Sequence, residues 1–383
     1  MRVEGIWYAT HSPIAVEIQG GKIVARDSIP MMPHLPWLSP GFVDIQVNGY
    51  AGFDYSNPAL SGEHILSIIR ALATKGTFYH CPTLITSATR TIVENCGKIA
   101  RAASDNRRIS QALCGIHIEG PYISAEDGPR GAHDPRFIRN PDYDEFRAWQ
   151  DAARGMIKIV TLAPELPGAL RFIERITQEG VIASIGHSAA PPEVIRDAVR
   201  AGARLSTHLG NGSHGMVPRL KNYLWEQLAC DDLNASIIAD GFHLPDAVLK
   251  VMARAKSLSR LILISDVAHL AGSAPGIARW GSMEVEVHAD GHLGLAGTQF
   301  LAGAGHLLDR DIAQFVRATG VPVPEAVRLC VDNPRTLLGL RAVDLPQPGD
   351  TASIVAFHLP SSALAIDISH SLFEGEEMTA NAT

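Results

Sequence analysis

The chain has 383 residues, which exceeds the roughly 250 at which one hydrophobic core stops growing, so we expect about two domains. Apolar residues make up 46% of the chain and charged residues 19%, and this balance excludes wholesale disorder. The formal net charge of −7 offers no general attraction to nucleic acid or to an anionic membrane, so neither is an expected partner.

Five cysteines are spread along the chain without a CxxC pair, at Cys81, Cys96, Cys114, Cys230 and Cys330. An odd count at such spacings predicts neither a disulfide framework nor a thiolate zinc site. The first residues interleave charge and glycine with apolar side chains, unlike a signal peptide, and no apolar run reaches the length of about 18 residues that spans a membrane. We therefore expect a cytoplasmic protein with reduced cysteines.

Both ends of the chain have the texture of β-strands. Near the start, Ile14–Ile18 and Lys22–Ala25 are separated by a Gly-Gly pair, which is a hairpin signal. The proline-rich stretch Pro30–Pro40 indicates a linker, and Thr351–Phe357 resumes the β pattern near the other end. We expect the two ends to pair into one small β-domain and the acidic tail from Glu374 to fray.

Between these ends, short apolar runs alternate with amphipathic segments, the pattern of βα units and a parallel sheet. The eight runs are Phe42–Val47, Thr77–Cys81, Leu113–Ile118, Ile157–Leu162, Val181–Ile185, Arg204–Thr207, Ser236–Ala239 and Leu261–Ile264. Eight strands with intervening helices over about 225 residues match a (β/α)8 barrel. A Rossmann fold would need a GxGxxG turn after the first strand, and the sequence has none there.

The predicted fold class is therefore α/β, a (β/α)8 TIM-like barrel with a small β-domain built from both termini. We place the barrel at residues 40–343 and the small domain at residues 1–39 and 344–383. In barrels of this type the reactive groups lie at the C-terminal ends of the strands, so the residues that follow each run are the candidates for chemistry.

Polar side chains follow six of the eight expected strands. Glu119 ends the third strand, and His187 and His208 follow the fifth and sixth. One carboxylate and two imidazoles form a three-ligand set that leaves a zinc coordination position open for water. Asp266, after the last strand, would face that water and take its proton. A lone histidine at a strand end is more often a hydrogen-bonded structural residue, but four such groups at one barrel mouth favour a metal centre.

Seven short segments carry a further signal, namely Pro40–Asp44, His117–Pro121, Val160–Glu165, Gly186–Ser188, Thr207–Leu209, Ile238–Gly241 with His243, and Ser265-Asp266. In order and approximate spacing they resemble the N-acetylglucosamine-6-phosphate deacetylases of the amidohydrolase superfamily. The similarity runs from about Pro40 to Gly339. It implies a metal-dependent barrel with a small β-sandwich made from both termini, commonly a homodimer, that hydrolyses the acetamide of an amino-sugar phosphate.

The resemblance also implies roles for single residues. Asp266 looks like the catalytic acid and base, and the metal ligands look like Glu119, His187 and His208. The substrate-binding residues it implies are His133 near the acetamide, His243 as a further substrate ligand, and Asn211, Gly212 and Arg219 around the phosphate.

The first strand bears on the number of metal ions. It ends in Gln46-Val47-Asn48, where many members of the superfamily carry a His-x-His pair that binds a second ion. Neutral amides are poor zinc ligands. We therefore expect one divalent ion per subunit, with zinc as the first expectation and iron(II) or another divalent ion as the alternatives.

Departures from the family pattern lie on the substrate side. Asn211-Gly212-Ser213 is followed by His214 where relatives read Asn-Ala-Met, and Val267–Leu270 stands where they tend to have small residues. We expect the substrate to be N-acetylglucosamine 6-phosphate or a close amino-sugar phosphate. The alternatives are an amidohydrolase for another small amide, such as an N-acyl amino acid or a cyclic amide, and a catalytically inactive barrel scaffold.

Overall fold

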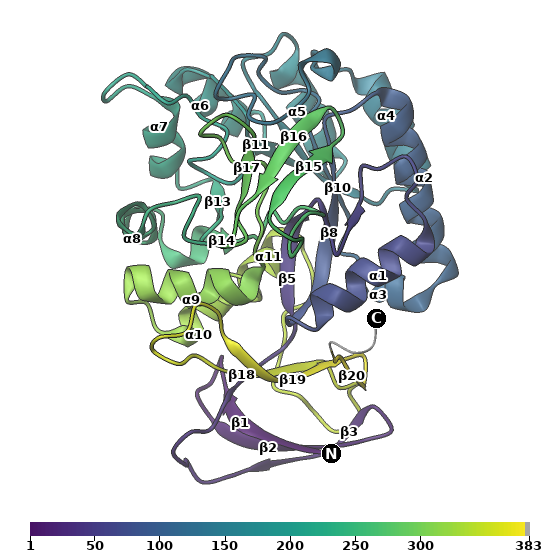
Figure 1. Ribbon diagram of the computed structural model, residues 1–383, viewed down its shortest axis with the longest axis vertical. Helices are drawn as coiled ribbons and strands as arrows, with labels where there is room; N and C mark the ends of the chain where they lie inside the picture. The colour runs from purple at the N-terminus through teal and green to yellow at the C-terminus, as the bar shows by residue number, and fades with distance from the viewer. Residues whose placement is uncertain (380–383) are drawn as a thin grey trace.

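A barrel of eight parallel strands dominates the computed structural model, which describes residues 1–379 (Figure 1). Its strands neighbour one another in chain order. They are β5 (Phe42–Val47), β8 (Thr77–Ile85), β9 (Ile116–Glu119), β10 (Ile157–Leu162), β11 (Ile182–Ile185), β12 (Leu205–Ser206), β13 (Asn234–Ile237) and β14 (Leu261–Leu263). All eight predicted runs overlap these strands, so the predicted barrel is confirmed.

The barrel closes between its first and last strands. Val47 forms a parallel bridge with Val267, just past β14, and the backbone N–H of Asp266 donates to the carbonyl oxygen of Gln46 at 3.1 Å. The third strand starts later than predicted, because Leu113 makes only an isolated bridge to His80. Closure matters for function because it brings the residues after β14 beside those after β5.

Helices surround the barrel, and their apolar faces turn inward. The helices are α1 (Gly62–Ala73), α2 (Thr89–Asp105), α3 (Arg107–Ala112), α4 (Tyr143–Ala152), α5 (Ala169–Gln178), α6 (Pro192–Arg200), α7 (Tyr223–Ala229), α8 (Asp246–Ala255), α9 (Leu308–Thr319), α10 (Val323–Arg328) and α11 (Asp332–Leu337). Helix α1 buries Ile65, Ile68, Ile69 and Leu72, which recur at helical spacing along one face. Within residues 1–379, none of these helices combines the length and the apolar character needed to cross a membrane.

The two ends of the chain form one seven-stranded sheet beside the barrel. Its strands are, in spatial order, β20 (Glu376–Glu377), β19 (Asp367–Phe373), β18 (Ile354–His358), β4 (Trp37–Ser39), β1 (Arg2–Trp7), β2 (Pro13–Gln19) and β3 (Lys22–Ser28). Figure 1 shows β18 and β19 in yellow between the barrel and the purple β1 and β2, so the sheet has two layers. The predicted β-sandwich built from both termini is confirmed.

The predicted fraying of the acidic tail is wrong at its start, over residues 374–377. Glu376 and Glu377 pair with Phe373 and Leu372, because the turn at Gly375 returns the chain along β19. Residues 380–383, the end of that tail, lie outside the described residues.

A small antiparallel sheet between β14 and α9 was not predicted. It consists of β15 (Gly276–Trp280), β16 (Met283–Val287) and β17 (Leu293–Leu295), and we call residues 276–295 the flap. A shorter hairpin, β6 (Gly49–Tyr50) with β7 (Phe53–Asp54), follows β5. Figure 1 shows the flap in green across the barrel. A separate hydrophobic cluster that includes Ala268 and Trp280 forms its core.

Candidate active site

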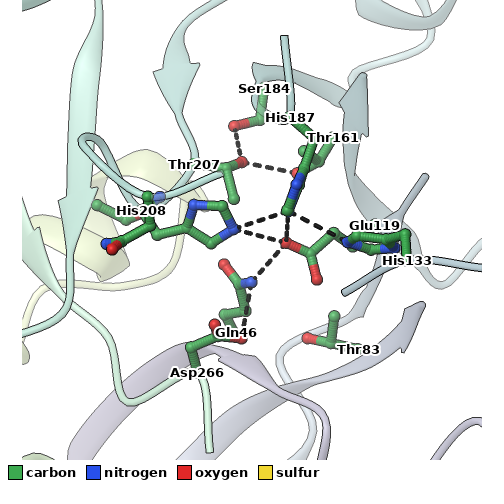
Figure 2. Close-up of polar contacts among 12 residues, drawn as sticks. Gln46, Thr83, Glu119, His133, Thr161, Ser184, His187, Thr207, His208 and Asp266 are labelled. Atoms are coloured by element: carbon green, nitrogen blue, oxygen red, sulfur yellow. Dashed lines mark hydrogen bonds and ion pairs between the residues drawn. The ribbon is translucent and has the colours of Figure 1, made fainter. Parts of the chain in front are cut away.

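Three side chains predicted to bind metal meet at the C-terminal end of the barrel. Oε1 of Glu119 lies 2.9 Å from Nε2 of His208 and 3.3 Å from Nε2 of His187. The two imidazole Nε2 atoms lie 3.1 Å apart. Figure 2 shows both rings directed at the same carboxylate oxygen. Three residues that are distant in sequence thus surround one small volume, as required for a shared ligand.

The backbone at these positions is unusual. His187, His208 and Asp266 have φ angles of 51°, 29° and 52°, in the left-handed region that residues other than glycine rarely adopt. Each of them lies two or three residues beyond the end of a barrel strand. Strained backbone of this kind clusters at functional sites, where it aims a side chain that an ordinary strand end would point elsewhere.

The proton on His187 can be assigned from its partners. Its Nδ1 atom lies 2.8 Å from the carbonyl oxygen of Pro129, which can only accept, so Nδ1 donates and Nε2 is the ring nitrogen that faces Glu119. Nδ1 of His208 is buried and has no partner within residues 1–379. The ring of His187 is therefore oriented with Nε2 toward the centre of the site.

Glu119 is held as a carboxylate. Burial alone raises its pKa, but hydrogen bonds with His187 and His208 outweigh this and hold the pKa well below the usual value of a glutamate. In return, the hydrogen bond with Glu119 raises the pKa of His208 despite the opposing effect of burial. The negative charge of Glu119 thus lies among the ring nitrogens of His187 and His208.

His133 lies beside this centre as well. Its Nε2 atom is 3.2 Å from Nε2 of His187, and the donor atoms of Glu119, His133 and His187 all lie within 4.8 Å of one another. Burial, followed by the charge of His187, lowers the pKa of His133 to about 3. It is carried by the loop after β9, whereas His187 and His208 directly follow barrel strands.

Asp266 faces the same volume and is fixed through one of its two oxygens. Its Oδ1 atom accepts from Nε2 of Gln46 at 2.9 Å and from Nδ2 of Asn48 at 2.8 Å. The same Gln46 amide donates to Oε1 of Glu119 at 2.8 Å, so it bridges the two carboxylates (Figure 2). Burial, followed by the charge of Glu119, raises the pKa of Asp266 to about 6. No group of residues 1–379 donates to Oδ2, so this oxygen is available for a proton.

A buried layer of hydroxyls and one imidazole supports the site from inside the barrel. His117 contacts the carbonyl oxygen of Ile45 through Nδ1 at 3.0 Å and the hydroxyl of Thr161 through Nε2 at 2.7 Å. Thr161 continues to Thr207 at 2.7 Å, and Thr207 to Ser184 at 2.5 Å. These bonds link strands β9 to β12, which carry Glu119, His187 and His208 at or beyond their ends.

The site opens into a cavity of about 350 Å³, within the usual range for small-molecule pockets. One side is polar and includes Asn211, Gly212 and His243. Nδ1 of His243 lies 2.8 Å from Oδ2 of Asp240, which leaves Nε2 for a ligand. The side chain Nδ2 of Asn211 is buried and has no hydrogen-bond partner in the described part of the chain. The cavity therefore offers polar atoms, on Asn211 and His243, that are available to a ligand.

Arg219 does not join the other predicted substrate residues. It is exposed on the loop between β12 and α7, and it does not line the cavity. No lysine or arginine of the described residues lines the cavity. Arg219, predicted to bind phosphate, is thus the only predicted site residue that does not line the cavity of its own chain.

Sequence reasoning missed the contribution of the flap. Trp280 and Met283 line the cavity, together with Phe300 and Leu301 from the segment that follows the flap. The signal was present, because Met283–Val287 alternates apolar and acidic residues and follows a turn at Gly281. It was not recognised because the eight barrel strands already accounted for the pattern of a TIM-like fold.

Comparisons with known proteins agree with this geometry, although no protein-family model matches the chain. N-acetylglucosamine-6-phosphate deacetylase of Bos taurus is 33% identical over 312 residues, which cover 79% of this chain and 75% of that protein. N-acetylgalactosamine-6-phosphate deacetylase of Escherichia coli O157:H7 is 29% identical over 354 residues, covering 91% of each.

A solved structure supports the same grouping. The N-acetyl-D-glucosamine-6-phosphate deacetylase of Mycobacterium smegmatis, an aspartate-to-alanine variant in complex with N-acetyl-D-glucosamine-6-phosphate, superposes with a TM-score of 0.86. It is 26% identical, and the match covers 99% of each chain. With the identity to the bovine enzyme over 79% of the sequence, this shows that the chain belongs to the N-acetylglucosamine-6-phosphate deacetylase family.

Proposed function

We propose that the protein hydrolyses the acetamide of N-acetylglucosamine 6-phosphate or of a close amino-sugar phosphate, giving the free amine and acetate. The observation that carries this proposal is the convergence of Glu119, His187 and His208 on one point, with Asp266 facing the same volume, in a chain of this family. An amide is a stable bond, so its hydrolysis needs both an activated water and a proton for the departing amine.

The donor set fits a divalent cation. One carboxylate oxygen and two imidazole nitrogens lie within 3.3 Å of one another, and the carbonyl oxygen of Pro129 accepts from Nδ1 of His187 and so orients Nε2 toward the centre. We propose one ion per chain, zinc first, held by Glu119, His187 and His208. Such an ion, when bound, acidifies a water molecule and polarises the amide carbonyl. Gln46 is a neutral amide already engaged by Glu119 and Asp266, which argues against a second ion.

Asp266 is the proposed proton carrier. Because Oδ1 is occupied by the amides of Gln46 and Asn48, the proton from the attacking water goes to Oδ2. The raised pKa, about 6, suits a carboxyl that accepts a proton in one step and returns it to the amine nitrogen in the next. Burial keeps bulk water from taking the proton instead.

Substrate binding is proposed to use the polar side of the cavity. His133 would donate to the acetamide or a neighbouring hydroxyl, and His243 to a further sugar oxygen. Asn211 and the backbone N–H of Gly212 would contact the phosphate, because a dianion is well matched by N–H donors. The unpartnered Nδ2 of Asn211 supports this assignment.

We propose that the protein forms a homodimer. The loop after β12 exposes Met216 and Leu220, which are 92% and 78% exposed, and Trp225 on α7 is 51% exposed. Apolar side chains gathered at the surface favour a protein contact. Arg219 lies on the same loop, so we propose that any contact it makes with phosphate depends on the dimer. Light scattering coupled to size exclusion tests the assembly, and its expected mass is that of two chains.

Two further assignments remain proposals. We place the protein in the cytoplasm on the basis of its unpaired cysteines and its proposed sugar-phosphate substrate. We also propose that residues 40–343 form the barrel domain and that residues 1–39 with 344–383 form the small one. Limited proteolysis is expected to cut near these boundaries before it cuts within the barrel strands.

The experiment that tests the function is an acetate-release assay with N-acetylated gluco and galacto sugars, each with and without a 6-phosphate. We expect the phosphorylated sugars to have the highest kcat/KM. The galacto epimer is the second candidate because the E. coli relative that matches 91% of this chain carries that name. Turnover of an N-acyl amino acid or a cyclic amide in place of every sugar would overturn the proposal in favour of another amidohydrolase.

A further inference from the structure

The cavity ends on one side at the indole of Trp280, which comes from the flap and is only 6% exposed. A Cβ atom built on Gly303 would lie 3.4 Å from Cζ3 of Trp280 and 3.3 Å from the carbonyl oxygen of Asp266. Gly303 therefore lies close to both the indole edge and the backbone carbonyl of Asp266. Trp280 thus forms a wall of the cavity near Asp266, the proposed proton carrier.

Two partners fix the indole in place. Nε1 of Trp280 donates to Oδ2 of Asp54, on β7, at 2.8 Å. The ring of His269 lies edge-on to the indole, with centroids 5.4 Å apart and an interplanar angle of 73°. Asp54 follows the first barrel strand and His269 the last, so Trp280 is anchored to both strands at the barrel closure.

The cavity is chemically divided across Asp266. The polar residues Asn211 and His243 follow strands β12 and β13. On the opposite side, Ile85 at the end of β8 and Ala132 pack against the same hydrophobic cluster as Trp280. In barrel order, β14 with Asp266 lies between β13 and the pair β5 and β8. A substrate centred at Asp266 thus has a polar neighbourhood on one side and an apolar one on the other.

The geometry of an amide predicts which part of the substrate lies on which side of the cavity. A secondary amide is planar and trans, so the group on nitrogen and the group on the carbonyl carbon extend in opposite directions. With the sugar phosphate among the polar residues, the acyl group extends toward Trp280. Building on the proposed function, we propose that Trp280, held by Asp54 and His269, is the residue that restricts the acyl group to acetyl.

The expected selectivity follows from how rigid the wall is. Each methylene added to the acyl group would have to displace a ring that is held by a hydrogen bond and by a second aromatic ring. One methylene in a pocket changes kcat/KM by about 10–200-fold. Wild-type protein is therefore expected to prefer N-acetyl to N-butanoyl glucosamine 6-phosphate by about 100-fold or more.

The test compares N-acetyl, N-propanoyl and N-butanoyl glucosamine 6-phosphate as substrates of metal-loaded protein. Trp280→Leu should lower the acetyl-to-butanoyl ratio of kcat/KM by about tenfold or more. Asp54→Ala keeps the indole but removes its acceptor, so it should lower the ratio in the same direction by a smaller factor. Ile277→Ala, at a 62% exposed flap position, is the matched control and should leave the ratio unchanged.

The outcomes separate this inference from the function on which it rests. Wild-type protein that releases acetate while Trp280→Leu and Asp54→Ala keep the wild-type ratio would overturn the role of Trp280 and leave the function intact. Equal wild-type turnover of acetyl and butanoyl substrates would overturn it too. Wild-type protein that releases no acid from any of the three substrates would overturn both. Acetyl turnover by each variant also reports whether its site is folded.

Discussion

The Nε2 atoms of His187 and His208 lie 3.1 Å apart and face the same oxygen of Glu119. Nδ1 of His187 donates to the carbonyl oxygen of Pro129, which turns Nε2 toward the centre of the site. Two ring nitrogens this close to each other and to one carboxylate oxygen are stabilised by a proton or a cation placed among them. The arrangement is thus better suited to a metal ion than to an isolated hydrogen-bond network.

Removal of a ligand should remove the ion. His208→Ala is expected to lower metal affinity by a large factor, since one of three ligands is lost, and to abolish activity. His133→Ala is the matched control, because His133 lies at the same centre but is assigned to the substrate. We expect it to retain about one ion per chain while kcat/KM falls. Elemental analysis of both purified variants gives the measurement. Loss of the ion from His133→Ala with retention in His208→Ala would reverse the assignment of the two histidines.

Asp266→Asn should stop turnover without dismantling the site. The asparagine Oδ1 can still accept from Gln46 and Asn48, but the group can no longer take a proton. General acid–base catalysis contributes about 10²–10⁴-fold, so kcat is expected to fall by that factor. KM and metal content should change little. If kcat fell less than tenfold, the proton would have to be carried by another group.

Asn211→Ala should weaken binding and spare the fold. The side-chain Nδ2 is buried without an internal partner, so its removal breaks no hydrogen bond of the free protein. A hydrogen bond to a charged group contributes about 1.5–3 kcal/mol, which predicts a rise in KM for the phosphorylated sugar of roughly 10–100-fold. The thermal midpoint should remain near the wild-type value. An unchanged KM accompanied by a lower midpoint would instead assign Asn211 a structural role.

Asp44 makes stability depend on pH. It lies inside the barrel, where burial raises its pKa to about 7 against the lowering effect of hydrogen bonds from Ser265 and the backbone of Gln46. The native state therefore binds more protons at this group than the unfolded state between about pH 4 and pH 7, so its contribution to stability is lost as pH rises through that window. Asp44→Asn stays neutral and should remove this part of the decline.

The measurement is the thermal midpoint of wild type and Asp44→Asn at several pH values. Between pH 4 and pH 8 we expect the thermal midpoint of the variant to rise by a few degrees relative to that of the wild type. The reason is that 1 kcal/mol shifts the midpoint of a large domain by roughly 2–4 °C. The asparagine can still accept from the backbone N–H of Gln46 and donate to the hydroxyl of Ser265. Parallel curves for the two proteins would show that Asp44 does not titrate in this range.

The sequence was most informative where a residue ends a barrel strand. Glu119, His187, His208 and Asp266 could be placed together because the C-terminal ends of parallel strands meet at one face of a closed barrel. The β-domain was predictable for a similar reason, since both termini have strand patterns with no other partner.

The contacts made by loops were less predictable. Trp280 comes from an inserted sheet whose position over the cavity depends on Asp54 and His269, and no local pattern encodes those distant contacts. Arg219 was inferred from a resemblance, but its loop extends into solvent in the single chain. The role of Gln46 in joining two carboxylates also required the structure, because sequence spacing shows only that it is an unsuitable metal ligand.

The most direct test of the central claim is the release of acetate and free amine from N-acetylglucosamine 6-phosphate by protein that contains one ion per chain. We expect equal amounts of the two products. We also expect loss of the reaction in Asp266→Asn and after chelation, with recovery when a divalent ion is restored. Two results would contradict the proposed function. One is metal-loaded protein that releases no acetate from this sugar or its galacto epimer, and the other is an Asp266→Asn variant that is as active as the wild type.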